Sequence, residues 1–138
     1  MDIFLPSKRR WAGYLAEAKA LMYYQQLGYI LCLQNGRHFR AEVDLLLWHP
    51  RERHLVAVEV KFRSQAPEIL PLTLRQARRI YRAACALRPL PLKDEEVEVQ
   101  LCLITGRLES PQIQVFAEFL RLGSEVLRHG NCLPLQKY

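Results

Sequence analysis

Two apolar segments separated by a short polar turn constrain the fold of this chain most. Residues 41–48 and 54–62 each have the length of one strand, and the second is rich in the β-branched side chains that strands favour. Strands that are joined by a short turn, here residues 49–53, run antiparallel to each other. We therefore expect a hairpin whose largely apolar surface is interrupted by Asp44, Glu59 and Lys61.

The other periodic segments complete an α/β pattern. Helical spacing of apolar residues predicts helices, and short apolar runs between turn residues predict strands. The expected elements are helices over about 7–28, 73–87 and 117–128, and strands over 29–33, 41–48, 54–62, 97–104 and 112–116. The order is therefore α-β-β-β-α-β-β-α. Because the third strand reaches the fourth through a helix, that pair is expected to be parallel, in a mixed sheet with helices on both faces.

Two local patterns refine this picture. In the first helix, Trp11, Tyr14 and Met22 fall on one apolar stripe, and Gly28 follows as a C-cap. After the first strand, Asn35-Gly36 is a strong turn signal. We therefore expect the stripe to be buried in the core or in a dimer interface, and the first hairpin to reverse at residues 35–36.

Length and cysteine content limit the class of protein. The 138 residues are expected to form one domain, with a core over about 8–128 and a tail over 129–138. No apolar run reaches the roughly 18–20 residues of a membrane span, and no signal-peptide pattern is present. Four cysteines without metal or redox spacing are expected to be buried, reduced thiols: Cys32, Cys85, Cys102 and Cys132. Together these features favour a cytoplasmic protein without a membrane partner.

The net charge of +6 is unevenly distributed along the chain. Residues 61–90 carry seven Lys and Arg against one Glu, whereas residues 41–60 carry two against four. Fifteen of the 20 cationic side chains are arginine, which binds phosphate in a bidentate manner and stacks on bases. This distribution favours a nucleic-acid partner, although an arginine-rich surface that is merely solvated would carry the same charge.

Charged side chains interrupt the two central strands at positions that share a face. Strand residues alternate between faces, so Glu42 and Asp44 share one side of the first strand, and Glu59 and Lys61 share one side of the second. An ionised group that is buried without a partner costs several kcal/mol, so these side chains require one. The plainer alternative is a local ion pair between Lys61 and Glu59, with Asp44 solvated at a sheet edge.

The same residue types suit a divalent metal ion. Mg²⁺ prefers hard oxygen ligands, keeps several waters, and needs only one or two carboxylates from the protein. The candidate ligands for Mg²⁺ or Mn²⁺ are Asp44, Glu59 and the main-chain carbonyl of Val60. Metal-bound water has a lowered pKa and can attack phosphorus. Lys61 could orient that water or stabilise charge in the transition state.

The spacing of these residues resembles the PD-(D/E)XK nuclease superfamily. Asp44 is followed, after fourteen residues, by Glu59-Val60-Lys61. The wider pattern resembles one small bacterial branch, the YraN-like family of endonuclease-like proteins. The residues that carry this resemblance are Gly13, Glu17, Ala18, Leu27-Gly28-Tyr29, Asn35, and residues 42–45 and 55–63. It covers residues 9–87 well and the rest loosely.

The resemblance implies a three-layer α/β/α fold of the restriction-endonuclease type. It also implies a catalytic site of Asp44, Glu59 and Lys61, with Glu17 as an accessory acid from the first helix. Gln76 stands where the family usually has a lysine, so it could contact the site or DNA. The Arg-Phe-Asp signature of the family is absent, and residues 97–100 read Val-Glu-Val-Gln instead.

Three functions remain open at this point. The first is a Mg²⁺-dependent endonuclease acting on DNA, including branched or damaged DNA, and a homodimer would suit cutting of both strands. The second is an inactive nuclease-fold protein that only binds nucleic acid, and the third is a protein-interaction subunit. For the first two, the expected nucleic-acid contacts are Arg63, Arg75, Gln76, Arg78, Arg79 and Arg82.

Overall fold

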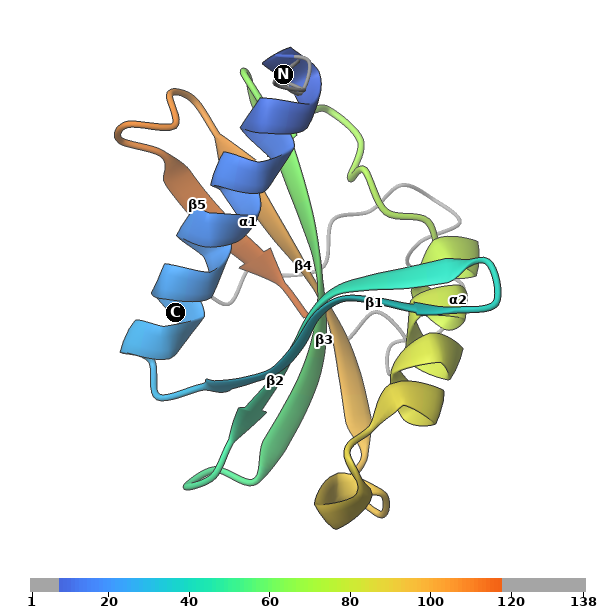
Figure 1. Cartoon of the computed structure of the whole chain (residues 1–138). Helices are drawn as coiled ribbons and strands as arrows, with labels where there is room; N and C mark the ends of the chain where they lie inside the picture. Colours follow the sequence, from blue (N-terminus) through green and yellow to red (C-terminus); the bar gives the residue numbers. More distant parts are fainter. Residues whose placement is uncertain (1–7, 118–138) are drawn as a thin grey trace, which may run out of the picture.

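The computed structural model describes residues 8–117, which form a mixed five-stranded sheet and two α-helices (Figure 1). The strands lie in the order β1-β2-β3-β4-β5; β3 and β4 are parallel, and the other neighbouring pairs are antiparallel. The elements are α1 (Lys8–Gln26), β1 (Ile30–His38), β2 (Ala41–His49), β3 (His54–Arg63), α2 (Leu74–Leu87), the short 3₁₀ helix η1 (Leu90–Leu92), β4 (Val97–Thr105) and β5 (Gln112–Phe116).

These elements confirm the predicted α/β class, the mixed sheet and the parallel β3–β4 pair. The predicted helix over 117–128 and the tail over 129–138 extend beyond residue 117, outside the described part of the chain. The restriction-endonuclease-like order stays a prediction.

Each helix packs against its own set of sheet residues. Leu55 and Ala57 of β3 belong to the apolar cluster that contains α2, whereas Val56, Val58 and Val60 belong to the cluster that contains α1. Successive side chains of a strand point to opposite faces, so the two clusters lie on opposite sides of β3 (Figure 1). A strand covered on both faces has to be apolar along most of its length, which explains the composition of β3.

The buried stripe of α1 differs from the predicted one. Ala16, Ala20 and Tyr24, which are four residues apart, are buried, whereas Trp11 and Tyr14 are 55% and 51% exposed. The small alanine side chains let the helix backbone approach the sheet closely, so the larger aromatic side chains are excluded from the contact. The prediction that Trp11 and Tyr14 belong to the core is therefore wrong, and their place in a dimer interface stays a prediction.

The predicted C-cap of α1 is confirmed. Gly28 has a φ of +100°, in the left-handed region that favours glycine. Its N–H donates to the carbonyl of Gln25 at 3.0 Å, and the next N–H, of Tyr29, donates to the carbonyl of Tyr24 at 3.1 Å. This pair of bonds is a Schellman motif, which ends the helix and directs the chain into β1.

The predicted turn at Asn35-Gly36 is wrong. Both residues lie within β1, and the chain reverses at Phe39 and Arg40 instead. A Cβ atom at Gly36 would lie 2.4 Å from Cδ1 of Leu33. A side chain at this position would displace the Leu33 methyl group, so the close approach favours glycine within the strand, which is the second common reason for glycine in a sheet.

A capping box begins α2 and fixes the place of Gln76. The Thr73 hydroxyl accepts a hydrogen bond from the Gln76 N–H at 3.1 Å, and the Gln76 amide oxygen accepts one from the Thr73 N–H at 2.9 Å. Two N–H groups that a helix terminus leaves without intrahelical partners are satisfied in this way. The cap engages the oxygen of the Gln76 amide and leaves its nitrogen to face other groups.

Three of the four cysteines lie within residues 8–117, and all three are free. Cys102 is buried, and burial raises the pKa of its thiol to about 12, while Cys32 and Cys85 are only half-buried. Cys132 lies outside this region. Neither helix that the structure describes is long and apolar enough to cross a membrane.

A buried hydrogen bond links α1 to β4 and provides a test of the packing. Tyr24 Oη donates to Gln100 Oε1 at 2.7 Å, and both residues are almost fully buried. Removing the hydroxyl deprives a buried acceptor of this donor, which costs about 1–3 kcal/mol. We expect Tyr24→Phe to lower the free energy of unfolding in urea by that amount. Tyr14→Phe, at an exposed position of the same helix, should leave it unchanged; equal stability of Tyr24→Phe and wild type would contradict this account.

Candidate active site

Strands β2 and β3 separate at Asp44. Their ladder ends at the pair Leu45–Val58. Beyond this pair, β2 turns with β1 toward α2, while β3 continues alongside β4 (Figure 1). At the point of separation, Asp44 Oδ2 accepts a hydrogen bond from the backbone N–H of Val60 at 2.8 Å. The carboxylate therefore takes the place of a main-chain acceptor and is held in the opening between the two strands.

Glu59 and Lys61 lie next to this opening on the same face of β3. The Lys61 Nζ atom is 3.0 Å from Glu59 Oε1, and their side chains are 30% and 15% exposed. The local ion pair of the plainer alternative is therefore present. Its second half is wrong, because β2 lies between β1 and β3 and Asp44 is not on an edge strand.

Burial and mutual repulsion disfavour the charged forms of these acids. Burial first, and then the charge of Glu59, raises the pKa of Asp44 to about 7, although the Val60 N–H works in the opposite direction. Burial also raises the pKa of Glu59, and Lys61 offsets this effect only in part. Two close carboxyl groups in such surroundings retain a proton near neutral pH. A cation in the opening would relieve this repulsion.

These shifts predict how the stability of the metal-free protein depends on pH. A carboxyl whose pKa rises on folding makes the folded state bind more protons, so stability falls as pH increases from about 4 to about 7. Each tenfold change in proton affinity corresponds to about 1.4 kcal/mol, so we expect a loss of about 1–3 kcal/mol between pH 5 and pH 8. Urea denaturation in EDTA measures it. Asp44→Asn should flatten the dependence, and Asp94→Asn, at an exposed site, should not; equal slopes in all three proteins would contradict the assignment.

Two further carboxylates adjoin the first pair. With its amide nitrogen turned toward the acids, Asn35 donates to Glu17 Oε1 at 2.6 Å and to Glu42 Oε1 at 3.2 Å. Burial, followed by the charges of Glu42 and Glu59, raises the pKa of Glu17. The accessory acid implied by the resemblance therefore lies within electrostatic reach of the central pair.

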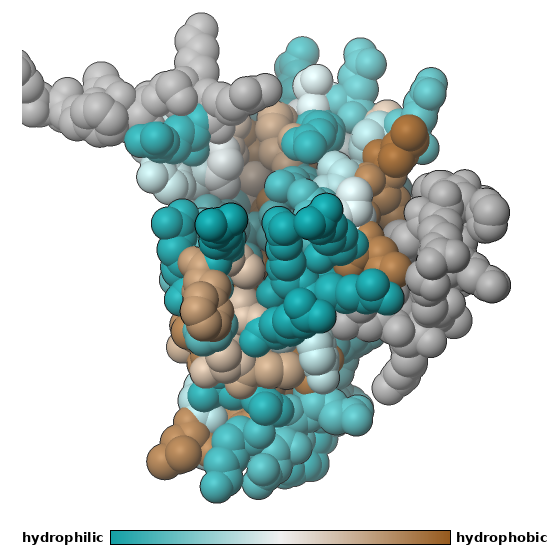
Figure 2. All heavy atoms as spheres, turned by 90° about the vertical axis from the view of Figure 1, so that its right-hand side faces the viewer, coloured by the Kyte–Doolittle hydropathy of each residue, from teal (hydrophilic) through white to brown (hydrophobic). Residues whose placement is uncertain are grey.

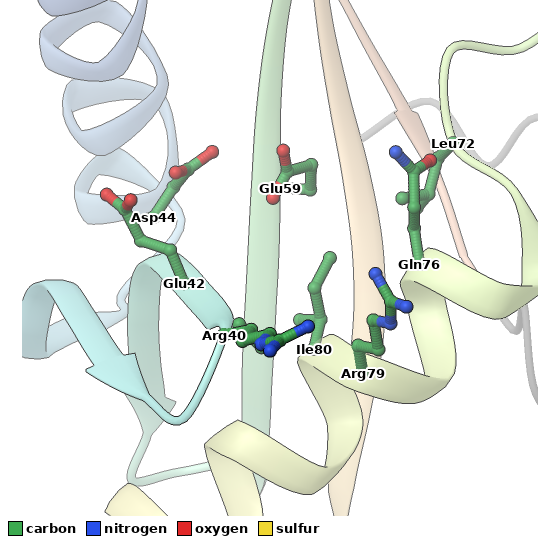
Figure 3. A pocket seen from close by; sticks show the side chains of 9 residues that line it. Arg40, Glu42, Asp44, Glu59, Leu72, Gln76, Arg79 and Ile80 are labelled. Carbon is green, nitrogen blue, oxygen red and sulfur yellow. The ribbon is translucent and has the colours of Figure 1, made fainter.

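An open pocket of about 240 Å³ lies between the separated strands and α2 (Figure 3). The acids Glu42, Asp44 and Glu59 stand on one side of it, and Gln76 and Arg79 of α2 stand on the other. The complete lining is Arg40, Ala41, Glu42, Asp44, Glu59, Leu72, Gln76, Arg79 and Ile80. A pocket with carboxylate oxygens on one wall and a guanidinium on the opposite wall can hold a cation and an anion side by side.

The predicted nucleic-acid residues fall into two groups. Gln76 and Arg79 line the pocket. Arg75, Arg78 and Arg82 are exposed on α2 outside the lining, and Arg63 is exposed at the end of β3, where its Nη1 donates to the carbonyl of Phe62 at 2.7 Å. Helix α2 contains no acidic residue, and hydrophilic side chains gather on the face of the molecule where it lies (Figure 2).

Several members of the site were not predicted as site residues, for different reasons. Glu42 was expected on the same face as Asp44, two residues later, but was not included among the candidate metal ligands. Arg40 was not expected at the hairpin tip, because the turn was predicted at Asn35-Gly36. Asn35 was read as a turn residue. Leu72 and Ile80 are apolar and carry no signal beyond core packing.

The oxygen atoms around the opening form a possible donor set for a metal ion. Within residues 8–117, no group of three or more His, Cys, Asp and Glu side chains is arranged to hold a metal. The site offers two carboxylates instead, together with the carbonyl of Val60, which faces the same side of β3 as the N–H that Asp44 accepts from. All of these are hard oxygen donors, and Mg²⁺ commonly binds through one or two carboxylates while keeping its waters. The chemistry of the donor set therefore fits Mg²⁺ or Mn²⁺.

The sequence of the chain matches one family of proteins. No curated protein matches the sequence significantly. The model of the uncharacterised protein family UPF0102 matches residues 16–105, a segment that contains Glu17, Asp44, Glu59 and Lys61. This match covers well over half of the chain and agrees with the YraN-like resemblance of the sequence. The chain therefore belongs to the uncharacterised protein family UPF0102, the YraN family.

Proposed function

We propose that this protein is a metal-dependent nuclease that hydrolyses phosphodiester bonds in DNA and uses Mg²⁺ or Mn²⁺. One observation carries the proposal: two repelling, largely buried carboxyl groups stand where β2 and β3 separate, and they face an arginine of α2 across an open pocket. Repelling carboxylates in a pocket are the usual means of recruiting a divalent cation, and an adjacent guanidinium suits a phosphate.

The fold supports this proposal independently of the charges. The acids occupy neighbouring strands in the middle of a mixed sheet, with α1 packed on one side and α2 on the other. This is the arrangement expected of the restriction-endonuclease type that the sequence resembles. Membership in UPF0102 is consistent with a nuclease-like fold.

Each residue of the site has a task in the proposed reaction. Asp44 and Glu59, with the carbonyl of Val60, would bind the ion, and the charges of Glu17 and Glu42 would strengthen its attraction. When bound, the ion supplies an activated water and neutralises charge on the scissile phosphate.

The remaining groups act on the substrate. Lys61, released in part from Glu59 by the cation, would place its ammonium beside the charge that develops in the transition state. Arg79 would hold a phosphate at the opposite wall, and the nitrogen of Gln76 would donate to the backbone of the same strand.

A cleavage assay on the full chain tests the proposal. End-labelled duplex, single-stranded and four-way-junction DNA are incubated with wild type in Mg²⁺, in Mn²⁺ and in EDTA. We expect products that form only with a divalent cation and that disappear in Asp44→Asn but not in Asp94→Asn. Cleavage that persists undiminished in Asp44→Asn would show that the assigned site is wrong.

One observation favours a second function, an inactive nuclease-fold protein that binds nucleic acid. Lys61 already pairs with Glu59 at 3.0 Å, so the site has a partner for this carboxylate without any metal. This alternative predicts salt-dependent DNA binding that is insensitive to EDTA, and no products with any of the three substrates. A cytoplasmic location and a homodimer remain predictions under either function.

A further inference from the structure

An aromatic side chain stands at the tip of the β1–β2 hairpin. Phe39 is 90% exposed, more than any other large hydrophobic residue that the structure describes. Its φ is +54°, in the left-handed region that non-glycine residues seldom adopt. An exposed phenyl ring on a strained backbone is unfavourable for the isolated fold, and such features persist mainly where function requires them.

The hairpin tip is continuous with the candidate active site. Arg40, the next residue, lines the pocket together with Arg79 of α2. Before Phe39, the His38 ring packs edge-on against the phenyl ring, with centroids 4.5 Å apart. Arg37 lies two residues before Phe39, and its Nη2 atom is 3.8 Å from Glu42 Oε2. The tip therefore presents an apolar ring to solvent and the Arg40 side chain to the pocket beside it.

We propose that Phe39 stacks on an unpaired base of DNA next to the phosphate that Arg40 and Arg79 engage, so that the favoured substrate is branched or forked DNA. The inference rests on the proposed function for the choice of ligand. Aromatic side chains beside a basic groove are the common means by which proteins bind single-stranded nucleic acid. Phe39 is the residue before Arg40, which lines the pocket, so a base stacked on its ring would belong to a nucleotide near the bound phosphate.

Continuous duplex DNA is a poorer partner for this tip. Its bases are already stacked on one another, so an inserted ring has to separate two of them first. An unpaired base at a fork or junction carries no such cost. The tip therefore discriminates by base exposure and not by base sequence.

The charge around Phe39 also distinguishes DNA from a protein partner. Arg40 and Arg79 line the pocket beside the tip, exposed Arg37 lies two residues before Phe39 and pairs with Glu42, and α2 carries arginines without any acid. A single phenylalanine buries at most about 250 Å², whereas a stable protein interface needs about 800 Å² on each partner. A polyanion with exposed bases fits both the charge and the small apolar area.

Binding measured by fluorescence anisotropy in EDTA tests the inference without cleavage. The full chain is titrated into a labelled duplex and into the same duplex with a splayed arm of unpaired bases. We expect wild type to prefer the fork, and Phe39→Ala to weaken fork binding about tenfold while changing duplex binding less than about twofold. Phe39→Tyr should retain fork binding. Leu90→Ala, which removes an exposed apolar side chain of η1 that does not line the pocket, is the matched control.

Several outcomes would overturn the inference. Fork affinity that is unchanged in Phe39→Ala, or an equal loss for fork and duplex, would remove the stacking role. A dimer that dissociates in Phe39→Ala during sedimentation, with fork affinity unchanged, would assign the tip to a second copy of the chain. The proposed function is judged separately by cleavage in Mg²⁺. If the protein cleaves DNA but its fork binding does not depend on Phe39, only this inference is refuted. If fork binding depends on Phe39 but no cleavage occurs, only the nuclease proposal is refuted.

Discussion

Replacing Asp44 with asparagine should reduce DNA cleavage by about three orders of magnitude, because it removes one of two carboxylates that hold the cation and so about 4 kcal/mol of charge stabilisation. The fold should survive, since the asparagine oxygen can still accept the hydrogen bond from Val60. The same variant should be more stable than wild type in metal-free buffer at pH 8, because it removes a buried charge that Glu59 repels. Initial cleavage rates and urea denaturation measure the two effects.

The opposite signs of these effects make the result specific. A variant that loses activity because it unfolds would lose stability as well. A substitution that relieves repulsion in a functional site instead raises stability and lowers activity. Asp94 is exposed, so Asp94→Asn should change neither the cleavage rate nor the stability. Asp44→Asn that is both less stable and less active than wild type at pH 8 would count against the electrostatic account.

Replacing Lys61 with alanine should slow cleavage by about 10²–10³-fold, the usual effect of removing one group that stabilises transition-state charge. It should not weaken metal binding. Lys61 competes with a cation for Glu59, so the variant should bind Mn²⁺ at least as tightly as wild type. Calorimetric titration with Mn²⁺ and turnover at saturating Mn²⁺ separate the two contributions.

The matched control for this variant is Lys93→Ala, which removes an exposed ammonium of the loop that follows η1. It should leave both affinity and turnover unchanged. If Lys61→Ala loses Mn²⁺ affinity in parallel with turnover, Lys61 supports the site structurally. If turnover is unaffected, its ammonium has no part in the reaction.

The central pair of the site was predictable because it depends on two regularities that sequence displays. Strand alternation puts Asp44 and Glu59 on a shared face once their strands are neighbours, and the short turn between the strands makes them neighbours. The ion pair of Lys61 with Glu59 follows from their i, i+2 spacing on one strand. The distances, the burial of Asp44 and its bond to Val60 depend on where β2 leaves β3, and no local pattern encodes that point.

The misread features depend on long-range packing. Asn35-Gly36 has turn chemistry, but in the structure both residues belong to β1, where Gly36 pairs with Val43 and packs against Leu33. The hairpin therefore reverses at Phe39 and Arg40, and Arg40 lines the pocket, which the predicted turn did not indicate. In α1 the large aromatic side chains suggested the buried stripe, whereas the sheet selects the small ones, Ala16 and Ala20.

The central claim is that Asp44 and Glu59 hold a divalent cation, and anomalous scattering from crystals soaked in Mn²⁺ tests it most directly. The account predicts an anomalous peak between the two carboxylates and the Val60 carbonyl, with the Lys61 ammonium displaced from Glu59. The peak should be absent from crystals of Asp44→Asn. Saturating Mn²⁺ that leaves no peak in this opening and leaves the Lys61–Glu59 ion pair intact would contradict the account.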